Sequence, residues 1–249
     1  MTVSSGFRDH FSARSEHYAR YRPHYPSTLF EFLASLTAKH SLAWDCATGS
    51  GQAAIALSAH FERVFATDAS KAQIDAAIAH PGVTYRVAAA EASQLDAGSI
   101  DLITVGQALH WFDIERFSTE AERVLVSDGV LAAWCYELCR ASDACDAVVD
   151  ELYTEVVGKF WPPERHLIEA GYAGIAMPGR ALESRDFHMS ASWTVNDMLG
   201  YLRTWSACTR YRQVHGDDPV LKIEKALRAA WGEGHRPVRW PLTLLVSRL

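Results

Sequence analysis

Two carboxylates and a glycine-rich turn are the residues whose types and spacing best fit a chemical role. The segment Asp45–Ala54 reads DCATGSGQAA, and it fits the pattern G-x-G-x-x-A through Gly49, Gly51 and Ala54. Asp68 follows 17 residues after Gly51, where the next strand is expected to end. A carboxylate there can accept both hydroxyls of a ribose. This order predicts an adenosine-binding site, and a tight turn with a surface Asp is the alternative.

Asp45 bears on the kind of ligand that this turn would hold. A dinucleotide brings a pyrophosphate to the helix N-terminus, and an acid beside that terminus would repel it. S-adenosylmethionine (SAM) carries an ammonium and a sulfonium but no phosphate, so Asp45 favours SAM. A nicotinamide oxidoreductase stays an alternative, as does an acid that only caps the turn.

Short apolar runs alternate with helical patterns over the first half of the chain. We expect strands at residues 42–44, 63–67, 83–87, 100–105 and 130–134. We expect helices at residues 27–36, 52–60, 70–80 and 113–125. The strands lack polar alternation, as is typical where helices cover both faces of a sheet. The pattern therefore predicts an α/β fold with a doubly wound, mostly parallel sheet.

The last hundred residues have a different pattern, with more helix than strand. We expect helices at residues 144–160, 164–170, 194–210 and 219–231, and strands at 182–192 and 242–247. Thr194 and Asp197 have the spacing of a capping box. With no evident linker, we expect one domain over residues 1–249. It would comprise an N-terminal arm (1–26), a cofactor-binding half (27–140) and a part with further strands and an inserted helical cap (141–249).

Composition excludes several classes of protein. The 249 residues carry 30 acidic and 24 basic side chains, a net charge of −6, which argues against binding of nucleic acid. No apolar run is long enough for a membrane span, and the N-terminus lacks the apolar stretch of a secretory signal. Five cysteines without paired spacing, and no HExxH motif, predict reduced thiols, a cytoplasmic location and no metal.

The segment Asp45–Gly51 resembles the first motif of class I SAM-dependent methyltransferases, D-x-G-x-G-x-G, with Ala47 in place of the first glycine. Other segments resemble the methyltransferase type 11 branch, which includes proteins akin to trans-aconitate methyltransferase. They are residues 11–26, 90–101, 107–113 (QALHWFD), 123–131, 204–206 and 240–242. The resemblance implies a seven-stranded Rossmann-like sheet, with SAM as cofactor and S-adenosylhomocysteine as product.

The resemblance also implies roles for individual residues around the cofactor. The turn would wrap the methionine part of SAM with Asp45 toward its ammonium, and would include Ala47, Thr48, Gly49, Gly51 and Gln52. Asp68 would bind the ribose, and the adenine and the methyl donor would lie near Ala69, Ser70, Ala90, Glu91, Gln107 and Ala108. A solvated loop is the alternative for residues 90–91, and an amide that ties down a loop is the alternative for Gln107.

The N-terminal arm carries a second hypothesis. The resemblance implies that it folds over SAM as a lid, in which Tyr18 and Arg22 contact the cofactor and Tyr21 contacts the substrate. An arginine there could pair with the carboxylate of SAM or of a substrate. A polar arm on the surface is the alternative.

The acceptor is expected beyond the fourth strand and under the C-terminal helices. His110 could orient the substrate, act as a base or serve the fold alone, and Trp111 would form a pocket wall. Trp205 and Tyr211 are candidate substrate contacts, although aromatic residues at helical spacing are usually core. Arg203, Arg210 and Arg212 would favour an anionic substrate if they pointed inward, and surface positions are the alternative for each.

These observations predict a SAM-dependent methyltransferase that acts on a small molecule by SN2 displacement, with an anion as one candidate for that molecule. A carboxylate oxygen is the leading acceptor, since it is already ionised and needs positioning alone. A hydroxyl or amine acceptor is the next candidate, and a SAM-binding regulator without catalysis is the rival of another class. The oligomeric state stays open.

Overall fold

The apolar runs of the sequence form one twisted sheet in the computed structural model, which describes residues 23–249. Within this range, seven strands follow one another in the order β3-β2-β1-β4-β5-β8-β6, and β7 pairs with β8 beside this path. The strands are β1 (Leu42–Cys46), β2 (Arg63–Asp68), β3 (Val83–Val87), β4 (Ile100–Gly106), β5 (Leu125–Tyr136), β6 (Arg180–Ala181), β7 (Phe187–Trp193) and β8 (Arg236–Arg248). The pairs from β3 to β5 are parallel, and those of β8 are antiparallel. The predicted mostly parallel, Rossmann-like sheet with a path of seven strands is therefore confirmed, and β7 adds an eighth strand beside that path.

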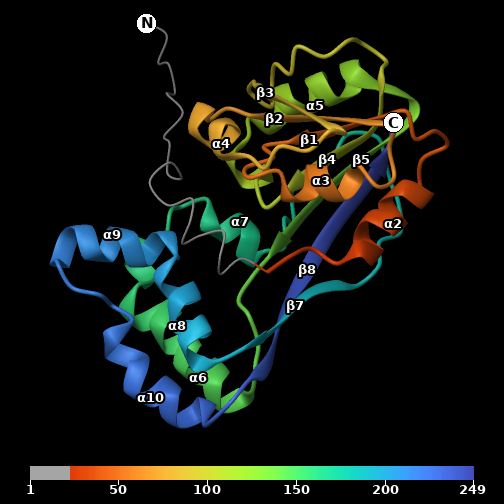
Figure 1. The fold of residues 1–249 in the computed structure, drawn as a ribbon. Helices are drawn as coiled ribbons and strands as arrows, with labels where there is room; N and C mark the ends of the chain where they lie inside the picture. Colours follow the sequence, from red (N-terminus) through yellow and green to blue (C-terminus); the bar gives the residue numbers. More distant parts are fainter. Residues whose placement is uncertain (1–22) are drawn as a thin grey trace, which may run out of the picture.

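Helices cover both faces of the sheet, as a doubly wound fold requires (Figure 1). On one face, α2 (Ser27–Ser35) and α3 (Gln52–Leu57) bury side chains in the same core as Val64, Leu102 and Val130. On the other face, α5 (Ile114–Val124) packs in a core with Trp44 and Ile103. The short helix α4 (Lys71–Ala76) follows β2. Because β2 and β4 lie on opposite sides of β1, the order of the strands reverses there, where ligands bind in open α/β sheets.

Strand β8 is shared by the sheet and by a helical region. Its second half pairs with β5, whereas its first half pairs with β7. Figure 1 shows this long strand running from the α/β part down to helices α6, α8 and α10. We call the group α6 (Asp143–Glu151), α8 (Val195–Arg203), α9 (Ser206–His215) and α10 (Leu221–Trp231) the cap. A two-stranded ribbon thus carries the cap on the sheet.

The cap differs from the expected helices in two places. The predicted helix 144–160 ends as α6 and continues as a π-helical turn (Leu152–Val156) and a 3₁₀ turn (Gly158–Phe160). The predicted helix 194–210 divides into α8 and α9 because Trp205 is extended (φ −59°, ψ 137°) and the Thr204 hydroxyl donates to the Tyr201 carbonyl at 2.6 Å. Side-chain bonds of this kind compete with the helical ladder. The strand expected at 182–192 is found at β7.

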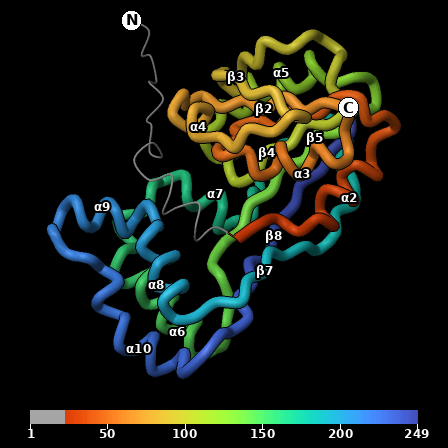
Figure 2. The backbone as a smooth tube through the Cα atoms, viewed as in Figure 1, coloured from red at the N-terminus to blue at the C-terminus, as the bar shows by residue number. Residues whose placement is uncertain are grey.

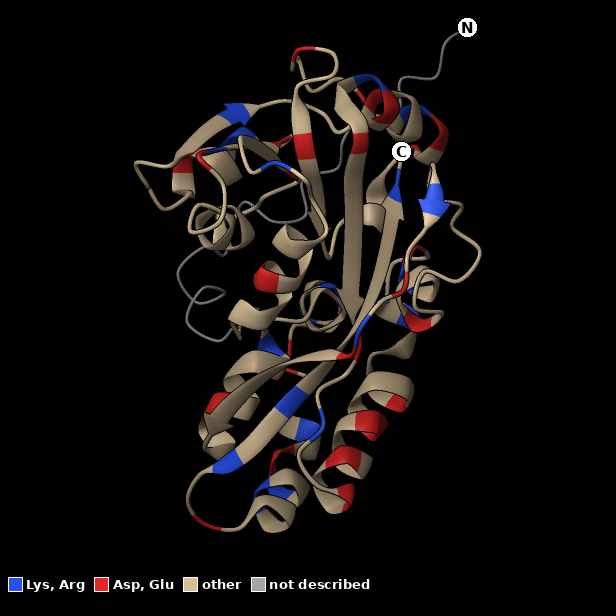
Figure 3. Ribbon diagram, turned by 90° about the vertical axis from the view of Figure 1, so that its right-hand side faces the viewer, with Lys and Arg blue, Asp and Glu red and all other residues tan. Residues whose placement is uncertain are grey.

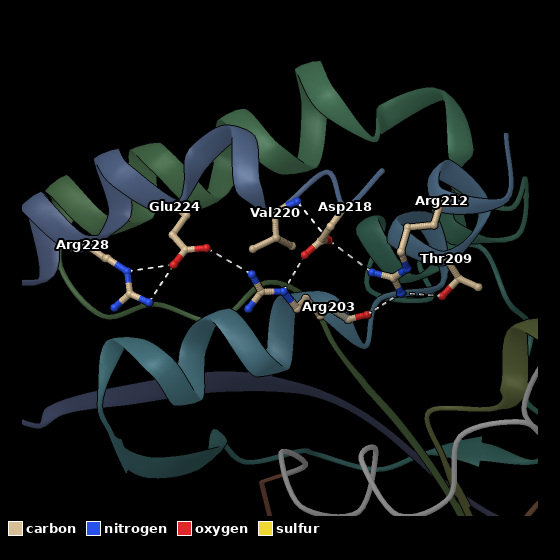
Figure 4. Close-up of polar contacts among 7 residues, drawn as sticks. All are labelled: Arg203, Thr209, Arg212, Asp218, Val220, Glu224 and Arg228. Atoms are coloured by element: carbon tan, nitrogen blue, oxygen red, sulfur yellow. Dashed lines mark hydrogen bonds and ion pairs between the residues drawn. The ribbon is translucent and has the colours of Figure 1, made fainter. Parts of the chain in front are cut away.

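Ion pairs join α10 and the loop before it to α8 and α9 (Figure 4). Arg203 pairs with Asp218 at 2.6 Å and with Glu224 at 3.1 Å. Arg212 pairs with Asp218 at 3.3 Å and also donates to the Arg203 carbonyl at 3.0 Å. Partly exposed pairs of this kind contribute little singly, but a shared network fixes the arrangement of the helices. Lys and Arg occur together with Asp and Glu in both the α/β part and the helical part of the molecule (Figure 3).

We expect Thr194→Ala to lower the free energy of unfolding by about 1 kcal/mol, because it removes the N-cap of α8. The Thr194 hydroxyl accepts from the Asp197 amide, and the Asp197 carboxylate accepts from the Thr194 amide at 2.9 Å. Urea unfolding followed by circular dichroism measures the change. Thr119→Ala on the exposed side of α5 is the control and should shift stability by less than about 0.5 kcal/mol. Equal losses for both variants would contradict the role of the cap residue.

Candidate functional site

The glycine-rich turn lies between the ends of β1 and β2 and has an unusual backbone. Ala47, Gly49 and Gly51 all have positive φ angles, of 56°, 56° and 86°. A Cβ atom at Gly51 would overlap the hydroxyl of Tyr85, which donates to the Ile78 carbonyl at 2.9 Å. Position 51 therefore requires glycine. Ala47 adopts a conformation that glycine takes at no steric cost, which accounts for a glycine at this position of the D-x-G-x-G-x-G motif.

Asp45 is buried at the carboxyl end of β1, where two hydroxyl groups hold its carboxylate. Thr48 Oγ1 donates to Oδ2 at 2.5 Å, and Thr104 Oγ1, from β4, donates to Oδ1 at 2.8 Å. Burial raises the pKa of Asp45 to about 6, and the charge of Asp68 adds to the rise. The hydroxyl bonds oppose the shift. The hydrogen bonds thus do not fully offset the cost of burying the Asp45 carboxylate, and a nearby cation would stabilise its charged form.

Asp68 ends β2 and links the turn to the following helix. Its Oδ2 accepts from the Gly49 amide at 3.0 Å, and its Oδ1 accepts from the Ser70 amide at 2.8 Å. Ser70 in turn caps α4, while Ala69 beside it is exposed. The Thr48 amide donates to the Thr67 carbonyl at 2.9 Å, so the turn is fixed to β2 twice. Both predicted acids therefore lie at one edge of the sheet, on either side of the glycine turn.

The loop after β3 is tied to the start of α5. Ala90 is buried, and Glu91 accepts from the Asp113 amide at 3.0 Å. Asp113 itself caps α5 through the Arg116 amide. Glu91 thus has a structural partner.

The side chain of Gln107 is bonded to the end of β5. Its Nε2 donates to the Tyr136 carbonyl at 3.2 Å, and its Oε1 accepts from the Tyr136 amide at 2.7 Å. The Gln107 amide donates to the Trp134 carbonyl at 2.8 Å. This geometry corresponds to the alternative of an amide that ties down a loop. Ala108, the next residue, is buried.

His110 lies in a 3₁₀ turn (Leu109–Trp111) directly after β4 and is buried. Its Nδ1 is 3.1 Å from the hydroxyl of Tyr172. Burial, with a smaller effect of the Arg165 charge, lowers the pKa of His110 to about 3. The ring is therefore neutral near pH 7 and too weak a base for efficient general-base catalysis. Trp111 is 38% exposed, and its ring lies 4.7 Å from that of His110.

The two aromatic residues predicted as substrate contacts on the C-terminal helices pack against other side chains of the helical region. Trp205 and Tyr211 are buried, and the Trp205 ring packs at 5.5–6.1 Å from the rings of Tyr153, Trp161 and Tyr201. Arg203 and Arg212 are held by ion pairs (Figure 4). Arg210 points to the Phe160 carbonyl at 3.4 Å. Each of the three arginines thus has a partner in the helical region.

Sequence reasoning missed Arg165, the first residue of α7 (Arg165–Glu169). Its Nε donates to the Tyr153 hydroxyl at 2.8 Å, and its guanidinium lies 4.8 Å from the centre of the Trp161 ring. These residues line a hollow of about 360 Å³, which we call the α7 hollow. The other residues that line it are Thr154, Gly158, Pro162, Pro163, His166 and Glu169. An arginine on a short helix gives no sequence signal, because its aromatic partners come from other segments.

Three predicted contacts, Tyr18, Tyr21 and Arg22, lie outside the described residues. In residues 23–249, no three His, Cys, Asp or Glu side chains come together as a metal site would need. No helix in that range has the length and apolar character to cross a membrane.

Comparisons with known proteins identify the family of this chain. The family described as "Methyltransferase domain" matches residues 44–133, which contain both acids and the glycine turn. A Dictyostelium discoideum protein named a methyltransferase is 34% identical over 229 residues, which cover 90% of this chain and 87% of that protein.

Solved structures extend the likeness to the whole fold. A structure from Anaeromyxobacter dehalogenans, described as a type II methyltransferase, is 44% identical with a TM-score of 0.86. The match covers 91% of this chain and 97% of that one. A Bacillus halodurans structure with 20% identity and a TM-score of 0.52, covering 89% of this chain and 97% of that one, shares the fold. The chain belongs to the class I SAM-dependent methyltransferases.

Proposed function

We propose that this enzyme transfers a methyl group from SAM to a small-molecule acceptor, with a carboxylate oxygen as the acceptor atom. The observation that carries the cofactor assignment is the pair of acids on either side of the glycine turn. Asp45 is a buried carboxylate with a raised pKa, which suits an ammonium group and opposes a phosphate. Asp68 stands at the strand end where a ribose is bound in this type of sheet.

The residues of the turn fit the methionine part and the ribose of SAM. Tyr85 fills the space beside Gly51, whereas a Cβ at Gly49 would meet only Gln73 Oε1, at 3.9 Å, so a ligand can approach the backbone closely at Gly49. In this proposal Ala47, Thr48, Gly49 and Gln52 surround the methionine part, and Ala69, Ser70, Ala90 and Glu91 border the adenine. Tyr18, Tyr21 and Arg22 are retained as proposed contacts of the N-terminal arm.

Bound SAM supplies an activated methyl group, and the protein supplies position and a dry environment. An ionised carboxylate needs no base, which agrees with the pKa of about 3 for His110. Gln107 fixes the ends of β4 and β5 through the Tyr136 backbone, and so holds Ala108 and His110 in place. His110 would orient the acceptor from its fixed position, with Trp111 as a wall.

A release assay for S-adenosylhomocysteine tests this proposal. The assay uses a panel of candidate acceptors that contains small acids, phenols and amines. A thermal-shift experiment with SAM, S-adenosylhomocysteine and NAD tests the identity of the cofactor. We expect stabilisation by the first two compounds and turnover of at least one acid. Turnover of phenols or amines alone would overturn the carboxylate assignment, and stabilisation by NAD alone would overturn the cofactor assignment.

We expect Asp68→Ala to weaken the binding of S-adenosylhomocysteine by about 10- to 100-fold, since each hydrogen bond to a charged group is worth ~1.5–3 kcal/mol. Isothermal titration calorimetry measures the affinity. Asp75→Ala, which removes an exposed acid of α4 paired with Lys71, is the control and should bind as the wild type does. Unchanged affinity of a folded Asp68→Ala variant would sink the ribose assignment.

We expect Asp45→Asn to raise the free energy of unfolding of the ligand-free enzyme at pH 8 by up to about 3 kcal/mol. The folded pKa is raised from 3.8 to about 6, so the unfolded chain releases this proton first as the pH rises. Stability is therefore lost between about pH 4 and pH 6, and the asparagine variant escapes this loss.

Urea unfolding at pH 8 and at pH 4 measures the effect of Asp45→Asn, and the gain should shrink at the lower pH. The same variant should bind SAM more weakly, because a neutral amide does not attract the ammonium. A variant that is less stable than the wild type at pH 8 would contradict the burial argument.

We expect the pH profile of kcat to keep its shape in His110→Ala between pH 6 and pH 9. A ring with a pKa of about 3 has no ionisation in that interval, so its loss removes no limb of the profile. The acceptor KM should rise, since orientation is lost. Steady-state kinetics with the best acid of the panel measures kcat and KM at each pH. Disappearance of the acidic limb of the kcat profile would identify His110 as a base.

A further inference from the structure

Arg165 combines a fixed position with unused hydrogen-bonding capacity. Its Nε is bonded to Tyr153, whose hydroxyl also contacts Glu169, and its guanidinium lies over the rings of Trp161 and Tyr153. Among the residues that the structure describes, no acceptor is bonded to its Nη1 or Nη2. A stacked guanidinium with two open NH₂ groups is pre-organised for a planar anion, because little side-chain freedom is lost on binding.

Helix α7, which contributes Arg165 to the α7 hollow, also contacts the segment that follows β4, where the acceptor is expected. Helix α7 packs against the 3₁₀ turn Leu109–Trp111, and Tyr172, just beyond α7, contacts His110. Burial lowers the pKa of His110, and the nearby charge of Arg165 adds a smaller lowering. At the end of β5, burial raises the pKa of Cys135, and the charge of Arg165 opposes that rise. Figure 2 shows α7 between the cap and the sheet.

The hollow is open to solvent and has room for a small molecule. Its volume of about 360 Å³ lies in the range of small-molecule sites. The rings of Tyr153 and Trp161, with centroids 4.8 Å apart, form an aromatic part of the wall beside the guanidinium. Ion pairs occupy Arg203 and Arg212 in the cap, whereas the terminal nitrogens of Arg165 are unpaired within residues 23–249.

We propose that the α7 hollow binds the methyl acceptor and that Arg165 anchors an anionic group of it that is not methylated. This inference rests on the proposed function and names its substrate class. An oxygen clamped by a guanidinium is a poor nucleophile, since its charge is already shared in two hydrogen bonds. The acceptor therefore carries two polar groups, one held by Arg165 and one presented to the methyl donor.

Matched acceptor pairs test the anchor. Isophthalic acid is compared with 3-carbamoylbenzoic acid, and glutaric acid with its monoamide, so that the reacting carboxylate is kept and the second charge is removed. For the wild type we expect the diacids to have a kcat/KM about 10- to 100-fold higher, expressed mainly in KM. Arg165→Gln should abolish this preference, and Arg165→Lys should retain part of it.

Lys159→Gln is the control, because it removes the same charge from an exposed neighbour outside the lining of the hollow. It should keep the preference for diacids. Full diacid activity in Arg165→Gln would overturn the proposal. An equal loss for acids and monoamides would also overturn it, since that result indicates general damage to the hollow.

A binding measurement separates this inference from the proposed function. Quenching of tryptophan fluorescence by isophthalate is titrated in enzyme saturated with S-adenosylhomocysteine. Binding to the wild type that is lost in Arg165→Gln supports the anionic anchor, even if no compound of the panel is methylated. A lack of methylation would count against the carboxylate reaction alone. No binding to the wild type overturns the anchor and leaves the cofactor assignment standing.

Discussion

The buried carboxylate of Asp45 is the constraint on which the arrangement of the site depends. Thr104 connects it to β4 and Thr48 connects it to the glycine turn, so one group joins three segments at the strand ends. Burial opposes its ionisation and raises its pKa. An acid kept in such a place makes the empty protein less stable than a neutral residue would, and it becomes favourable when a cation binds. In the proposed function, the ammonium group of SAM is the cation that would stabilise this carboxylate.

The rest of the structure connects the cap to that end of the sheet. Strand β8 pairs with β5 along one half and with β7 along the other, so the ribbon under the cap continues the sheet. One continuous core extends from Val130 and Trp134 in β5 to Met198 and Trp231 in the cap. Continuous packing of this kind resists deformation. It therefore fixes the distance between the cap and the strand ends within narrow limits.

The sequence was informative wherever the signal is local. Strands, the glycine turn and the two acids follow from neighbouring residues, and the capping box of Thr194 was visible from its spacing. The division of the helix at Trp205 and the partner of Gln107 depend on contacts that spacing alone does not reveal. Tyr136 lies 29 residues from Gln107, and Arg165 acquires its role from Tyr153 and Trp161. Such pairings arise from tertiary packing and leave no periodic trace.

In the proposed site, acidic and basic side chains lie in different places, each beside the ligand of opposite charge. Acids stand at the cofactor end, where SAM brings positive charge, and Arg165 stands beside α7 at the proposed acceptor end. The sulfonium loses its charge during methyl transfer, so water near the reacting atoms would stabilise the ground state more than the transition state. A cation that holds the acceptor away from its reacting oxygen gives binding without weakening the nucleophile. In this proposal Asp45 and Arg165 belong to separate parts of the site, one for the cationic donor and the other for the anionic acceptor.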